Sequence, residues 1–113
     1  MVSRRNCRYR VEYGGSFLGE QKTVQGVILD LSLEGGRARS SEEFNKGEFL
    51  RVLIDAPRYE KPLHVTLAVV RWSKEKEFGM EFIQMEPDDQ QRFRQLIRET
   101  AAAAALSTQD GFR

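Results

Sequence analysis

The sequence contains few of the residues that disulfides, metal sites and membrane spans require. Among its 113 residues are one cysteine, Cys7, and one histidine, His64. A lone cysteine excludes an internal disulfide, and a lone histidine without a second ligand at suitable spacing argues against a zinc site. No apolar run reaches the roughly 18 residues of a membrane span, and no apolar segment follows the first charges as in a signal peptide. We therefore expect a cytoplasmic protein that holds no metal and does not enter a membrane.

Catalytic motifs are lacking as well. The sequence shows no Ser/His/Asp or Cys/His set, no P-loop and no dinucleotide-binding fingerprint. The acidic pairs Glu42/Glu43 and Asp88/Asp89 are neighbours in the chain, which is typical of a solvated loop and a helix start. We predict that the protein is not an enzyme and uses no cofactor.

Charge is balanced overall but uneven along the chain. Lysine and arginine number 18 against 17 acidic residues, a net charge of +1 that gives no reason to expect nonspecific binding to nucleic acid. The first ten residues nevertheless hold Arg4, Arg5, Arg8 and Arg10. A chain of this length makes one domain. We expect residues 1–10 to form a flexible arginine-rich arm ahead of a single folded unit.

Short segments with a period of two predict β-strands in the first three quarters of the chain. Leu50, Val52 and Ile54 share one face of a half-buried strand while Arg51 points the other way. A glycine-rich stretch at residues 14–16 breaks the first strand. The predicted strands are residues 9–13, 22–31, 48–55, 63–72 and 78–82, with a turn at 73–77 between the last two. Several short strands at this spacing favour an antiparallel barrel or sandwich.

Alternation in the fourth strand bears on Trp72, the only tryptophan. Counting by two places Leu63, Val65, Leu67 and Val69 on one face and Trp72 on the other. An outward indole would offer a stacking surface for a base. The alternative is an indole packed under the helix or the arm.

The period changes to that of a helix at about residue 87. Pro87 suits the first turn, and the two aspartates that follow complement the positive end of the helix dipole. The apolar stripe consists of Phe93, Leu96, Ile97, Thr100, Ala101 and Ala104. The alanines from 101 to 105 have little side chain to bury, so we expect fraying there and a disordered tail at residues 107–113.

Two motifs in this order resemble those of the PilZ domain family. Arg4-x-x-x-Arg8 is followed by Asp30-x-Ser32-x-x-Gly35, and the resemblance extends from Arg4 to about Arg98. It implies a mainly β fold, a small antiparallel β-barrel of the split-barrel type over residues 8–100, with one C-terminal α-helix from about residue 87. It also implies a receptor for the bacterial second messenger cyclic di-GMP.

The chemistry of that ligand explains the residue types. Its two guanines present O6/N7 edges and its two phosphodiesters carry negative charge, and arginine meets either target with a planar fork of donors. The resemblance assigns Arg4 and Arg8 to phosphate and guanine, and Asp30, Ser32 and Gly35 to the guanine side. Further candidates for ligand contact are Arg5, Gly36, Arg10 and Trp72.

We expect binding to order the arm and to change the surface shown to a protein effector, with the protein a monomer or weak dimer. Two other functions are compatible with parts of the pattern. One is a protein-interaction barrel of PilZ shape that binds no nucleotide. The other is a nucleic-acid binder using the arm, which the near-neutral charge disfavours. The sequence leaves open the effector, its pathway and whether one cyclic di-GMP or an intercalated pair binds.

Overall fold

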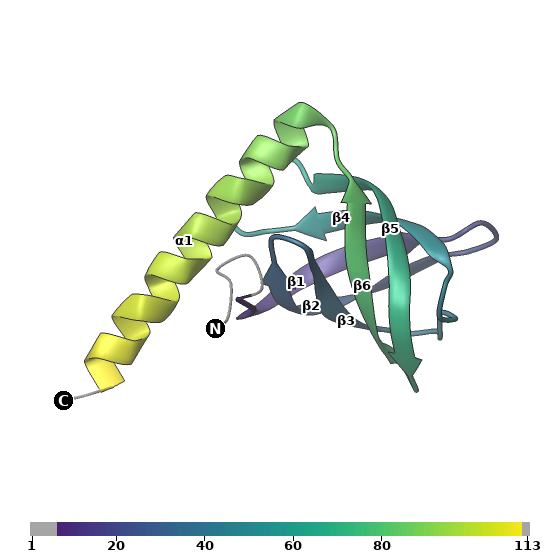
Figure 1. Ribbon diagram of the computed structural model, residues 1–113, viewed down its shortest axis with the longest axis horizontal. Helices are drawn as coiled ribbons and strands as arrows, with labels where there is room; N and C mark the ends of the chain where they lie inside the picture. Colours follow the sequence, from purple (N-terminus) through teal and green to yellow (C-terminus); the bar gives the residue numbers. More distant parts are fainter. Residues whose placement is uncertain (1–6, 112–113) are drawn as a thin grey trace.

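The computed structural model describes residues 7–111, which form a closed antiparallel barrel of six strands and one C-terminal helix (Figure 1). The strands are β1 (Tyr9–Leu18), β2 (Thr23–Ser32), β3 (Gly35–Ser40), β4 (Phe49–Asp55), β5 (Leu63–Lys74) and β6 (Glu77–Gln84), and the helix is α1 (Pro87–Gly111). Around the barrel the order is β1-β2-β3-β6-β5-β4, and β4 pairs back with β1. Closure pairs every sheet edge. The predicted fold class is confirmed.

The barrel interior is filled by the alternating apolar residues of its strands. Leu50, Val52 and Ile54 are at most 2% exposed, as their spacing predicted. Three phenylalanine rings meet edge to face at the centre, with centroids 5.1 Å apart for Phe17 and Phe78 and 5.2 Å for Phe44 and Phe78. Each buried aromatic ring removes a large apolar area from water, so this cluster supplies a major part of the folding energy.

Two segments expected to be irregular belong to the barrel. The predicted break at residues 14–16 is wrong, because β1 runs through it. A Cβ on Gly15 would lie 3.0 Å from the ring of Phe17, and one on Gly26 would lie 2.2 Å from the carbonyl oxygen of Arg39. These glycines let the backbone pass close to its neighbours within a tightly curved barrel. The short strand β3 was not predicted.

Bulges shift the faces of β5. The pairing of β5 with β6 changes register between Leu67 and Ala68. Leu67 is therefore only partly buried, while Ala68, Val69 and Val70 are all buried, so the predicted place of Leu67 on the buried face of Leu63 is wrong. The predicted turn is shorter than expected, because β5 continues to Lys74 and β6 starts at Glu77.

The helix begins where predicted and covers one end of the barrel. Phe93, Leu96 and Ile97 are buried against the strands. A loop between β4 and β5 holds the helix from outside: the Tyr59 hydroxyl donates to the carbonyl oxygen of Arg92, and Arg92 donates to the backbone of that loop. These contacts fix the angle at which α1 leaves the barrel.

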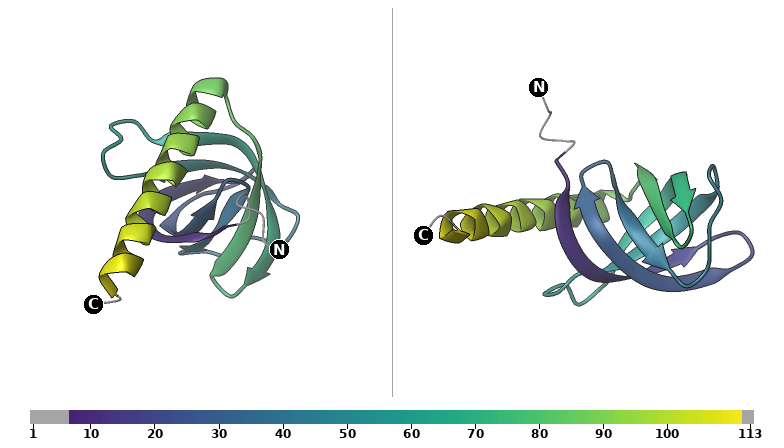
Figure 2. Two further views of the ribbon diagram at one scale, coloured as in Figure 1. Left: turned by 60° about the vertical axis from the view of Figure 1, so that its left-hand side comes forward. Right: turned by 90° about the horizontal axis from the view of Figure 1, so that it is seen from below.

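The C-terminal part of the helix projects beyond the barrel (Figures 1 and 2). It continues to Gly111, past residue 101 where fraying was expected. The disordered tail expected at residues 107–113 stays a prediction. The alanines bury little surface, but alanine has the highest helix propensity, and this propensity accounts for the continued helix. Residues 112 and 113 of the predicted tail lie outside the described residues.

Replacing Gly26 with Ala is expected to lower the free energy of unfolding by about 1–3 kcal/mol, because the new Cβ would overlap the backbone of β3. Gly14→Ala is the matched control in β1. Its Cβ would meet Asp55 at an ordinary 3.5 Å, so the change should stay within about 0.5 kcal/mol. Urea unfolding measures both, and equal effects would contradict the close approach of β2 and β3.

Candidate functional site

The β2–β3 hairpin explains the spacing of the second motif. Asp30 and Ser32 lie two residues apart on the outer face of β2, while Leu31 between them points into the core with 0% exposure. Leu33 and Glu34 form the turn, and Gly35 then pairs directly with Ser32. The five-residue distance from Asp30 to Gly35 is therefore the geometry of a tight hairpin.

A bulge aims Asp30 outward. Ile28 and Leu31 both point into the core although they are three residues apart, because the register of β2 against β3 shifts between Ile28 and Asp30. Without the extra residue, Asp30 would share the inward face of Ile28. Simple alternation could not have placed this side chain.

Ser32 and the glycines hold the hairpin closed. The Ser32 hydroxyl donates to the carbonyl oxygen of Gly35 at 3.3 Å and accepts from the backbone N–H of Glu34 at 3.2 Å. A Cβ on Gly35 would lie 2.0 Å from the carbonyl oxygen of Met80, and one on Gly36 would lie 2.5 Å from that of Asp30. The motif residues thus have a structural role in bringing β2, β3 and β6 close together.

The main partner of Asp30 is Arg37. Its Nε donates to Oδ2 of Asp30 at 3.1 Å, and its backbone N–H donates to Oδ1, also at 3.1 Å. Nη1 of Arg8 reaches Oδ1 at a longer 3.5 Å. Sequence reasoning missed Arg37, although the pairing of Asp30 with Arg37 follows from the hairpin once β3 is recognised.

Arg37 is the centre of a chain of alternating charges. Its Nη1 donates to Glu77 at 2.8 Å, and Glu77 also accepts from Arg39 at 3.0 Å. The hydrogen bond to Asp30, followed by the one to Glu77, raises the pKa of Arg37 above its ordinary value. The hydrogen bonds from Arg39 and then from Arg37 lower the pKa of Glu77. We call Asp30, Arg37, Glu77 and Arg39 the ion-pair chain.

Trp72 ends a row of residues that crosses four strands. Asp30 of β2 pairs with Arg37 of β3, Arg37 pairs with Gly79 of β6, and Gly79 pairs with Trp72 of β5. A Cβ on Gly79 would lie 2.0 Å from Nε1 of the indole, so the ring lies directly over this glycine. Trp72 remains 38% exposed, in agreement with its predicted outward orientation.

A cleft of about 300 Å³ lies between the hairpin and the indole. Among the predicted site residues it brings together Arg8, Ser32, Gly35 and Trp72. Arg71 also faces the cleft and donates from Nε to Glu81 at 2.7 Å. The full lining is Arg8, Ser32, Glu34, Gly35, Arg71, Trp72, Gly79, Met80 and Glu81.

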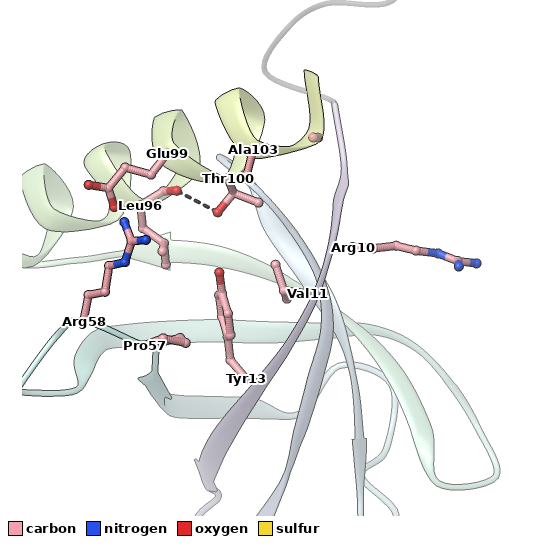
Figure 3. A pocket seen from close by; sticks show the side chains of 10 residues that line it. Arg10, Val11, Tyr13, Pro57, Arg58, Leu96, Glu99, Thr100 and Ala103 are labelled. Atoms are coloured by element: carbon pink, nitrogen blue, oxygen red, sulfur yellow. Dashed lines mark hydrogen bonds between the residues drawn. The ribbon is translucent and has the colours of Figure 1, made fainter. Parts of the chain in front are cut away.

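The other predicted residues have different positions. Asp30 does not line the cleft, but it contacts Arg8, which does. Gly36 is buried where β2 and β3 pair. Arg10 borders another cavity, of about 430 Å³ between α1 and β1, and its side chain points away from that space (Figure 3). Arg4 and Arg5 lie outside the described residues, as does most of the predicted arm.

Residues 7–111 contain neither a metal-binding cluster nor a helix that could span a membrane. The described histidine, cysteine and carboxylate groups form no cluster of three or more that could hold a metal ion. The described helix also lacks the apolar stretch needed to cross a bilayer.

Comparison with known proteins places these observations in a family. The family model described as PilZ domain matches residues 3–99. Curated proteins give no significant match.

Several solved structures share the fold. The inhibitor of motility MotI/DgrA of Bacillus subtilis superposes with a TM-score of 0.71 and 22% identity over 90% of this chain, which spans 53% of that longer protein. The PilZ domain of YcgR from Escherichia coli, solved with c-di-GMP, gives 0.73 and 14% identity over 95% of this chain and 98% of that one. The PilZ domain of CeSA from a cellulose-synthesizing bacterium gives 0.67 and 11%, covering 83% and 97%.

The ion-pair chain predicts a pH-dependent contribution to stability. Because the pKa of Glu77 is lower in the folded than in the unfolded protein, its ion pairs stabilise the fold above the unfolded value. That contribution is lost as the pH falls through the lowered folded value. The difference in unfolding free energy between wild type and Glu77→Gln should therefore shrink on acidification. Denaturant titrations at several pH values test this, with Glu60→Gln, an exposed loop carboxylate, as the control. A difference that is constant with pH would contradict the role of Glu77.

Proposed function

Because the chain belongs to the PilZ domain family, we propose that it is a receptor for cyclic di-GMP and that the nucleotide binds in the cleft between the β2–β3 hairpin and Trp72. The observation that carries the proposal is the meeting of four predicted site residues at one cleft. The same space is lined by residues from four different parts of the chain: Arg8, Ser32, Gly35 and Trp72.

Arg8 is suited to hold an anionic, guanine-bearing ligand. Its side chain is 56% exposed, and its one short-range partner among the described carboxylates, Asp30, is 3.5 Å away. The guanidinium can therefore turn toward a phosphate or a guanine edge at little cost. Asp30, which does not line the cleft, would then either hold Arg8 beside the ligand or accept from a guanine N1–H and N2–H edge.

Trp72 supplies an apolar face for a base. The indole rests on Gly79 and borders the cleft, so one ring face is supported while part of its surface stays open to solvent. Stacking of a base on an aromatic side chain contributes about 1–3 kcal/mol. The support from Gly79 fixes the ring in place before the ligand arrives, which reduces the entropy lost on binding.

The charge of the cleft supports a role for the N-terminal arginines. Arg8 and Arg71 face the cleft together with Glu34 and Glu81, so the described lining is close to neutral. A ligand with two negative charges needs further cations. Arg4 and Arg5 are the nearest arginines in the sequence, and we infer that Arg4 contacts the ligand and that Arg5 assists.

We further infer that the arm folds over the bound nucleotide and so changes the surface offered to a protein effector. The turn residue Leu33 and Ile83 of β6, which are 40% and 48% exposed, line a neighbouring pocket that shares Glu34 with the cleft. The receptor would act in the cytoplasm without catalysis, as a monomer or weak dimer.

Arg8→Ala is expected to weaken cyclic di-GMP binding about 10- to 100-fold, because it removes charge-assisted hydrogen bonds of roughly 1.5–3 kcal/mol. Isothermal titration measures the affinity and the stoichiometry together. Arg51→Ala, an exposed arginine of β4 away from the cleft, is the matched control and should bind like wild type. If Arg8→Ala matched wild type, the assignment of Arg8 would be wrong. No heat of binding with the intact wild type would favour the protein-interaction module.

Hydrogen exchange tests the ordering of the arm separately. Backbone amides from about residue 4 to residue 11 should gain protection when cyclic di-GMP is added, because the arm closes over the ligand. Amides in β4 provide the internal reference, since they lie away from the cleft. Binding without any change at residues 4–11 would reject the ordering step while leaving the receptor function in place.

A further inference from the structure

We propose that Arg37 is the positioning residue of the ligand site: it holds the Asp30 carboxylate in place and keeps Arg8 available to the ligand. This inference rests on the proposed function. It concerns a residue outside both sequence motifs, and it follows from the ion-pair chain on the outer face of the barrel.

Arg37 fixes both oxygens of Asp30. One oxygen accepts from the Arg37 backbone and the other from its Nε, both at 3.1 Å. Two contacts to two oxygens remove the rotation that a single hydrogen bond would leave to a carboxylate. The Asp30 side chain is only 12% exposed, so water competes little for these bonds.

Arg37 is itself held from its other side. Its Nη1 donates to Glu77 at 2.8 Å, and Glu77 is held in turn by Arg39. A guanidinium with carboxylates at two edges has few free rotamers. The orientation of Asp30 is thus set by three strands, β2, β3 and β6, before any ligand binds. A site arranged in advance binds with a smaller entropic cost.

The charge of Arg37 also matters for Arg8. Asp30 lies within 3.5 Å of Arg8, and a carboxylate without another cation would attract that guanidinium strongly. Arg37 neutralises Asp30 at shorter distance, so Arg8 is not needed to do so. Removing Arg37 would leave Asp30 to compete with the ligand phosphates for Arg8.

Arg37 acts through Asp30 and does not touch the ligand in this arrangement. It does not line the cleft of Arg8 and Ser32. It borders a separate hollow with Arg39, Trp72, Lys74, Glu75, Lys76 and Glu77. Trp72 borders both this hollow and the cleft, whereas Arg37 borders only the hollow.

The test is titration of cyclic di-GMP into Arg37→Ala, with Arg39→Ala as the matched control. Both arginines are on β3 and bind Glu77, but only Arg37 contacts Asp30. We expect Arg37→Ala to weaken binding about tenfold and Arg39→Ala to remain within about twofold of wild type. Equal affinities for Arg37→Ala and wild type would overturn the proposal, as would equal losses in the two variants.

A double-mutant cycle separates positioning from a general structural effect. In the Asp30→Asn background, Arg37→Ala should cause less than about a twofold further loss, because the group it positions has changed. An undiminished loss there would show that Arg37 acts independently of Asp30 and would overturn the proposal. If thermal unfolding shows that Arg37→Ala is not folded, Arg37→Lys takes its place. A smaller loss of affinity is then expected, because lysine keeps the positive charge but lacks the planar fork of donors of a guanidinium. Failure of the wild type to bind would instead count against the proposed function.

Discussion

The contact between Asp30 and Arg37 is the interaction on which the arrangement of the site depends. It joins neighbouring strands, saturates a nearly buried carboxylate and connects it through Glu77 to a third strand. An uncompensated carboxylate at this depth would be costly, because few water molecules reach it. The same contact leaves Arg8 with a longer and weaker one. One pair of side chains thus joins two strands of the barrel and, in the proposed site, also orients Asp30.

Sequence patterns gave the parts of this structure that depend on local chemistry. The faces of β4 followed from Leu50, Val52 and Ile54, and the helix start followed from Pro87 and its two aspartates. Ser32 and Gly35 meet at the cleft because their spacing encodes a tight hairpin, whereas Arg8 and Trp72 reach it from other parts of the chain. Each of these features depends on the hydrophobic period, the helix start or the turn length, which a few neighbouring residues determine.

The features that were missed depend on contacts between distant segments. The strand β3 begins with two glycines and contains two arginines, so its propensity is low, and it is a strand because β2 and β6 pair with it on both sides. The orientation of Asp30 and the faces of β5 depend on bulges in the pairing with neighbouring strands. Arg37 could be recognised only after the register of β3 was known.

Because the indole of Trp72 lies on Gly79 at the wall of the cleft, its fluorescence reports on that surface. The sequence has no other tryptophan, so all indole emission comes from the wall of the cleft. A purine placed on that ring would quench or shift the emission, while events at surfaces that Trp72 does not border would leave it unchanged. Occupancy of this one surface can thus be followed in the unlabelled chain, without a dye or a tag.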